Sequence, residues 1–125
     1  MISYCLGCAE DDFETMLVMY DAGRYSWSLF IGHLVIEKLM KAYFVQKNEE
    51  HPPFVHNLLR LALLNEISVD EELKQKLVTI SAFNINARYD DYKRSFHKTC
   101  TTKFTAEWVG IIKDLRLWML KQIEK

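Results

Sequence analysis

The chain has 125 residues, half of them hydrophobic and 26% charged, which is enough for one globular domain with its own core. The 16 Lys and Arg residues against 17 Asp and Glu give a formal net charge of −1, which excludes the large basic excess of a general nucleic-acid coat protein. No apolar run reaches the length of about 18 residues that a membrane span needs, and the N-terminal stretch lacks the basic region of a signal peptide. We therefore expect a single cytoplasmic domain over residues 1–125, with no contact to a membrane.

The first predicted helix contains Phe13, Met16 and Tyr20, which lie three and four residues apart and so share one helical face. The acidic residues at positions 10–14 are expected in its first turn, where negative charge suits the positive end of the helix dipole. Gly23 is a natural end for this helix.

The second predicted helix, residues 25–46, is the longest. Its apolar residues cover more than one face, which indicates burial on several sides or against a second subunit. Pro52 and Pro53 follow it and disfavour helix in the residues before them. From this broad apolar surface, and from that of the last helix, we expect a homodimer.

Three further helices are predicted in the second half of the chain. A short one covers residues 56–66, and Ser68 with Glu71 three residues later forms a capping-box pattern that opens the next. The polar stretch 89–102 interrupts the helical pattern. A fifth helix is expected from about Phe104 to the end of the chain.

These elements predict an all-α, up-and-down antiparallel bundle of about five helices, because most of the connections are short. If every helix spans the bundle, the alternating directions bring distant residues to one end. The residues expected there are Lys38, Lys41, His56, Arg88 and Tyr89.

Four pieces of the sequence, taken together, resemble the HEPN domains, which are small helical proteins of bacteria and archaea. The pieces are Gly23-Arg24-Tyr25, Glu37-Lys38 with Lys41-Ala42, His56-Asn57-Leu58, and Ala87-Arg88-Tyr89-x-Asp91. Their order and spacing cover the chain from the first helix to about Lys93. The resemblance implies a helical bundle that is often a homodimer, and we expect no cofactor.

The resemblance also implies two kinds of function. Many HEPN proteins act with a minimal nucleotidyltransferase encoded beside them, often as a toxin–antitoxin pair. Others are metal-independent ribonucleases, in which an Arg is followed after four to six residues by a His. Here the positions that would hold this His after Arg88 are Lys93, Arg94 and Ser95, and His97 follows after eight intervening residues. The chain is more similar to the ARYPD-type branch, which is linked with nucleotidyltransferases and with nucleotide or polynucleotide binding, with Asp90 in place of the Pro.

The residues that we expect to bind a ligand or a partner protein are Lys38, Lys41, His56, Arg88, Tyr89 and Asp91. A guanidinium binds phosphate through paired hydrogen bonds, and a Tyr ring stacks on a nucleobase. Structural roles for the same residues stay open. Arg88 suits the C-terminal end of a helix, Glu37 and Lys41 are spaced for a helical ion pair, and His56 could hold a loop. Nucleotide, RNA or nucleotidyltransferase binding is the main hypothesis.

Two alternatives rest on other residues. Arg94 and His97 could cleave RNA without a metal, as the cation that stabilises the transition state and the group that moves the proton. Cys5 with Cys8 and His97 with Cys100 could instead supply the four ligands of a structural zinc site in a dimer. In the cytoplasm the three Cys would otherwise be free thiols.

Overall fold

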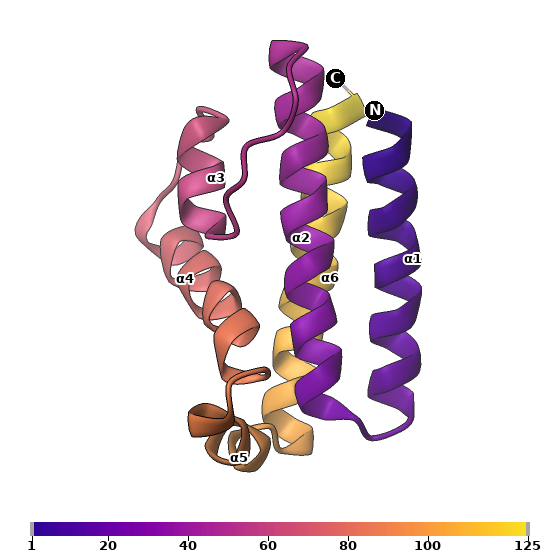
Figure 1. Ribbon diagram of the computed structural model, residues 1–125, viewed down its shortest axis with the longest axis vertical. Helices are drawn as coiled ribbons and strands as arrows, with labels where there is room; N and C mark the ends of the chain where they lie inside the picture. The colour runs from indigo at the N-terminus through magenta and orange to yellow at the C-terminus, as the bar shows by residue number, and fades with distance from the viewer. Residues whose placement is uncertain (1, 125) are drawn as a thin grey trace.

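The computed structural model describes residues 2–124, which form six helices and no strand (Figure 1). The helices are α1 (Ile2–Asp21), α2 (Tyr25–Asn48), α3 (Leu58–Leu64), α4 (Glu71–Asn86), α5 (Asp90–Thr99) and α6 (Thr102–Glu124). The prediction of an all-α helical bundle is therefore confirmed. Among the described residues, no helix combines the length and the apolar character that crossing a membrane requires.

Helix α2 is the centre of the bundle and packs against α1, α6, α4 and α3. Figure 1 shows α1 antiparallel to α2, while α6 runs in the same direction as α2 because α3, α4 and α5 carry the chain back to the end where α2 begins. The apolar residues on several faces of α2 are thus covered within one chain. The homodimer stays a prediction, but the broad apolar surface of α2 no longer requires a second subunit to cover it.

Gly32 sets how closely α2 approaches its neighbours. A Cβ atom at this position would lie 2.6 Å from Cδ1 of Ile112 on α6 and 3.0 Å from Sδ of Met16 on α1. Both of those residues are fully buried. The absence of a side chain at Gly32 therefore lets three long helices share one core.

Helix α1 begins at Ile2, well before the acidic residues that we expected in its first turn. The prediction of acids at the helix start is wrong, because nothing between Ile2 and Ala9 stops a helix, and Ala9 is buried in the core. Cys5 and Cys8 therefore lie on α1. The acidic residues lie in the middle of this helix.

The predicted capping box at Ser68 is also wrong. Asp70 is the N-cap of α4, and its carboxylate accepts a hydrogen bond from the Leu73 backbone N–H at 2.8 Å. Asp and Ser cap helices about equally well, so local preference did not separate the two positions. Asn57 plays the same part at the start of α3, where its side chain accepts from the Arg60 N–H at 2.9 Å.

The polar stretch 89–102, predicted to interrupt the helices, contains α5 (Asp90–Thr99). Asp90 and Asp91 occupy its first turn, where they favour the positive helix end. Phe96 is the buried residue of this helix, with its ring centroid 5.5 Å from that of Phe83 on α4. One buried apolar residue in ten gives too weak a period to recognise in the sequence.

The predicted gathering of binding residues at one end does not occur. After α2 ends, residues 49–57 run back along it, so the short α3 begins near the middle of α2 (Figure 1). His56 consequently contacts Glu37, whereas Arg88, just after α4, lies over the ring of Phe30. Phe30 and Glu37 are two helical turns apart, about 10 Å. The prediction failed because it assumed that every helix spans the bundle.

Candidate nucleic-acid interface

A groove of about 300 Å³ lies between the start of α2 and α5, and we call it the α2–α5 groove. It is lined by Ser26, Trp27, Ala87, Lys93, Arg94 and His97. The Trp27 side chain is 42% exposed, and the Lys93 ammonium lies 6.0 Å from the centroid of its ring. Arg94 and His97 are three residues apart on α5, and so they share a helical face. The groove combines an aromatic surface with two cations and an imidazole.

Arg88 and Tyr89 lie beside this groove, in the turn between α4 and α5. The Arg88 guanidinium is 5.8 Å from the Phe30 ring centroid and 5.6 Å from that of Tyr89, and its Nε donates to the Asn84 carbonyl oxygen at 2.9 Å. That hydrogen bond occupies a carbonyl in the last turn of α4, so Arg88 has the structural role that suits a helix end. The ring of Tyr89 is half exposed.

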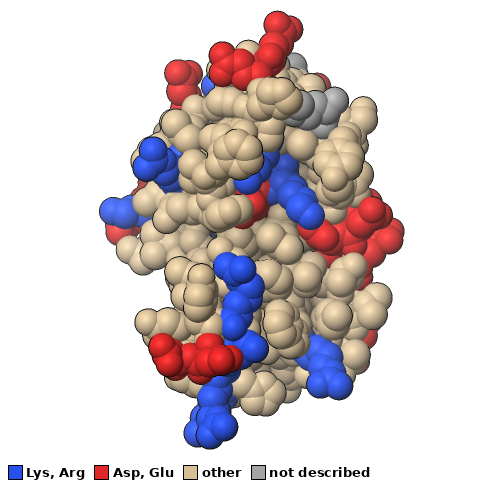
Figure 2. All heavy atoms as spheres, in the orientation of Figure 1, with Lys and Arg blue, Asp and Glu red and all other residues tan. Residues whose placement is uncertain are grey.

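Basic side chains gather on this part of the molecule. Figure 2 shows Lys and Arg in a column on the lower half of one face, with acidic side chains to one side of it. The nearest acid to Lys93 is Asp90, whose Oδ1 is 3.8 Å from the Lys93 ammonium. Asp91 is exposed in the first turn of α5. At 3.8 Å and in solvent, the contact with Asp90 leaves Lys93 largely available to an external phosphate.

The other two predicted phosphate-binding cations are paired with acids. The Lys38 ammonium is 2.5 Å from the Asp12 carboxylate of α1, and the Lys41 ammonium is 3.1 Å from the Glu37 carboxylate. Glu37 is buried, with 7% of its side chain exposed, and it also accepts from His56 Nδ1 at 3.1 Å. Lys41 and His56 therefore contact one buried carboxylate, Glu37, while Lys38 is paired with Asp12.

His33 completes this second cluster. It is fully buried, and its Nε2 lies 3.1 Å from the His56 carbonyl oxygen and 3.5 Å from Oε1 of Glu37. Both neighbours accept hydrogen bonds, so Nε2 carries the proton. Burial lowers the pKa of His33, against the opposing effect of the His56 carbonyl and Glu37. The imidazole is thus neutral, and its Nδ1 has no partner among the described residues.

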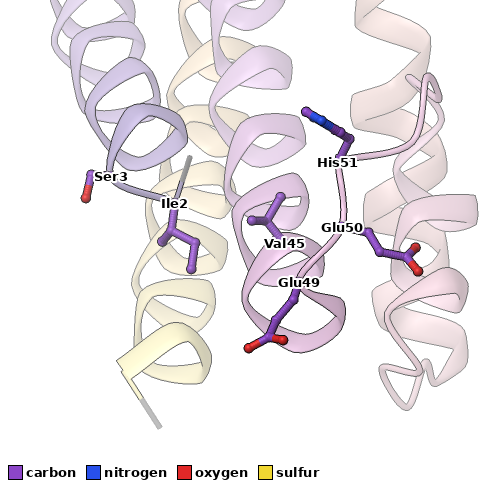
Figure 3. A pocket seen from close by; sticks show the side chains of 6 residues that line it. All are labelled: Ile2, Ser3, Val45, Glu49, Glu50 and His51. Atoms are coloured by element: carbon purple, nitrogen blue, oxygen red, sulfur yellow. The ribbon is translucent and has the colours of Figure 1, made fainter.

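A cavity of about 420 Å³ between the start of α1 and the end of α2 is a poorer candidate (Figure 3). Its polar residues are Ser3, Glu49, Glu50 and His51. The close-up shows the side chains of Glu49 and Glu50 pointing in different directions. Two divergent carboxylates neither bind a phosphate nor chelate one cation, so this cavity offers no recognisable site.

The proposed zinc ligands are separated by the length of the bundle. Cys5 and Cys8 lie near the start of α1, and His97 and Cys100 belong to the end of α5 at the opposite end of the molecule (Figure 1). No group of three or more metal-binding side chains forms among the described residues. The four residues cannot hold one ion within a chain. Burial raises the pKa of the Cys100 thiol to about 11, which keeps it protonated.

The all-helical fold agrees with a comparison against protein families. The family model described as HEPN domain matches residues 2–122, almost the entire chain. The chain belongs to the HEPN domain family. No match was found among the curated proteins or among the solved structures. HEPN membership points to a function that involves nucleotides or RNA, while the ARYPD-type branch stays a prediction.

In this HEPN domain the structure joins Lys93, Arg94 and His97 in one groove, and it adds Trp27, which the sequence did not connect with them. Trp27 comes from α2 and Lys93 from the unrecognised α5. In the sequence Trp27 is one more apolar residue of the predicted second helix, so no signal marked its ring as exposed. Nothing in the sequence placed it beside α5.

Proposed function

We propose that this HEPN domain binds single-stranded RNA in the α2–α5 groove. The observation that carries the proposal is that Lys93, Arg94 and Trp27 line the same groove. Lys and Arg bind the phosphate backbone, and an exposed aromatic ring stacks on a base of any type. Family membership supports RNA over other polyanions.

The pairing of charges favours this groove over the cluster around Glu37. Lys38 and Lys41 each contact a carboxylate, and a phosphate would have to displace it. Arg94 has no ion pair among the described residues and lies on the exposed side of α5. A phosphate can therefore contact Arg94 without breaking an existing salt bridge.

RNA binding can be measured by fluorescence anisotropy of a labelled single-stranded oligonucleotide in EDTA, over a series of salt concentrations. We expect Arg94→Ala to weaken binding and to reduce the slope of log affinity against log salt by about 0.7, the value for one phosphate contact to a single strand. Trp27→Ala should cost about 1–3 kcal/mol of binding free energy with the salt slope unchanged, because stacking releases no counterions.

Lys113→Ala is the matched control, since Lys113 is an exposed cation on α6 that does not line the groove. Its affinity and salt slope should equal those of the wild type. Equal losses in Lys113→Ala and Arg94→Ala would mean that RNA is attracted by general charge, and the groove would lose its assigned role.

RNA cleavage is a second candidate function of the same groove, favoured by the shared position of Arg94 and His97. His97 would take the proton of a ribose 2′-OH, and Arg94 would stabilise the charge that develops on the phosphate. The anisotropy samples, separated on a gel, decide between the two. Intact RNA identifies a binding module, and cleavage that disappears in His97→Ala identifies a ribonuclease.

The nucleotidyltransferase partner and the toxin–antitoxin pairing are predictions about a second protein. The exposed Tyr89 and Asp91 beside the groove are the residues that we expect such a partner to contact.

A further inference from the structure

His56 lies outside the α2–α5 groove and has the geometry of an activated imidazole. Its Nδ1 is 3.1 and 3.2 Å from the two carboxylate oxygens of Glu37. An ionised carboxylate only accepts hydrogen bonds, so Nδ1 carries the proton of the neutral ring. The lone pair of that tautomer is on Nε2, on the opposite edge of the ring from Glu37.

The carboxylate that orients His56 is itself held in place. Glu37 is buried on α2 and also accepts from the Lys41 ammonium at 3.1 Å. The carbonyl oxygen of His56 accepts from Nε2 of the buried His33 at 3.1 Å. Both the backbone and the ring of His56 are therefore fixed to one helix, and the ring does not have to be ordered when a ligand arrives.

The Nε2 edge of His56 is available to a ligand. The side chain is 68% exposed, and Nε2 has no hydrogen-bond partner among the described residues. His56 lines a groove of about 320 Å³ along α4, together with Asn57, Val78, Ser81, Ala82, Asn84 and Ile85. None of these residues is acidic, and the Arg88 guanidinium is hydrogen-bonded to the Asn84 carbonyl oxygen. The side-chain amides of Asn57 and Asn84 and the hydroxyl of Ser81 are groups that can donate hydrogen bonds to a phosphate oxygen.

We propose that His56 is a phosphoryl-acceptor site. Nε2 attacks the phosphorus of a phosphoryl donor and forms an N–P bond, while the bond from phosphorus to the leaving group breaks and its electron pair departs with that group. The proton on Nδ1 stays on the ring, and the Glu37 carboxylate stabilises the positive charge that the ring acquires. The proposal is independent of RNA binding at the α2–α5 groove.

A purely structural His56 would make the same contacts to Glu37, because they also fasten residues 49–57 to α2. The two roles differ in the reactivity of Nε2. A fastening residue needs no nucleophilic nitrogen, so it should react like other exposed histidines of the chain. His51, exposed five residues earlier, is such a reference within the same molecule.

The experiment treats the full chain with phosphoramidate, a small phosphoryl donor whose leaving group is ammonia. Phosphohistidine is then mapped by mass spectrometry under alkaline conditions, in which the N–P bond survives. We expect His56 to be labelled about ten-fold or more faster than His51, with the two rates converging when the chain is unfolded in urea. A rate at His56 no higher than at His51, or the same in urea as in the folded chain, would overturn the proposal.

Glu37→Gln tests the source of the reactivity, because it keeps the size of the side chain and removes its charge. Labelling of His56 should fall to the rate of His51, and RNA binding at the α2–α5 groove should not change. Unchanged labelling at His56 in a folded Glu37→Gln chain would contradict the role of the carboxylate. The wild-type comparison between His56 and His51 needs no variant, so it tests the proposal even if Glu37→Gln does not fold.

Discussion

At the scale of single residues, the buried polar side chains of α2 couple the bundle to pH. His33 is fully buried with Nδ1 unpartnered, and burial lowers the pKa of its imidazole. The unfolded chain exposes His33 with an ordinary pKa of about 6.5. Below that pH the unfolded state binds a proton that the folded state resists, so the free energy of unfolding falls as pH falls towards the folded-state pKa of His33.

We therefore expect the chain to lose stability between about pH 7.5 and about pH 5.5, as measured by urea unfolding. His33→Gln keeps an amide donor near the His56 carbonyl but does not titrate, so its stability should fall less over this range. His51→Gln changes an exposed histidine and should follow the wild type. If the free energy of unfolding falls equally with pH in the wild type and in His33→Gln, a group other than His33 causes the loss of stability.

At the scale of helices, one glycine fixes the distance between three of them. A Cβ at Gly32 would lie 2.6 Å from Ile112, whereas a Cβ at Gly110 on α6 would have no atom within 4 Å. Both glycines lie inside helices, where Ala is favoured over Gly by about 1 kcal/mol. Replacing Gly with Ala should therefore have opposite effects on the free energy of unfolding at the two positions.

Gly110→Ala should raise the free energy of unfolding by up to about 1 kcal/mol. Gly32→Ala should lower it by about 1–3 kcal/mol, because forcing a methyl group into a packed core displaces Ile112 and Met16. Urea denaturation monitored by circular dichroism measures both. A stabilising Gly32→Ala would mean that α1 and α6 can move apart freely, contrary to the packing described above.

At the scale of the whole molecule, α2 contacts the other five helices, and an aromatic cluster also joins α4, α5 and α6 to one another. Phe83 of α4 has its ring centroid 5.5 Å from Phe96 of α5 and 5.6 Å from Trp108 of α6. The core residues of α1, α2, α3, α4, α5 and α6 form one continuous apolar cluster. Such a core has no boundary at which one part could unfold alone.

We expect one cooperative unfolding transition, with tryptophan fluorescence and far-ultraviolet circular dichroism giving the same midpoint in urea. Trp27 reports on the start of α2, and Trp108 and Trp118 report on α6. Phe96→Ala serves as a contrast, since it should loosen α5 and lower the midpoint by removing a buried ring. Two separate transitions in the wild type would show that the helices do not share one core.

The sequence by itself determined the helical class, the family, and the start of α2 together with its end to within two residues. Those features depend on local information: apolar residues at helical spacing, the prolines at 52 and 53, and short motifs such as His56-Asn57-Leu58. Local preference has its own limit, because Ser68 and Asp70 are similar in capping strength and the sequence could not show which of them is the N-cap of α4.

Only the tertiary structure decided which side chains meet. His56 reaches Glu37 because residues 49–57 run back along α2. The spacing of hydrophobic residues predicts helices but does not predict the path of the loop between them. Helix α5 depends on the contact between Phe96 and Phe83, and without α5 the α2–α5 groove does not exist. Most of the helices are specified by neighbours along the chain, whereas α5 and both sites depend on residues that only packing brings together.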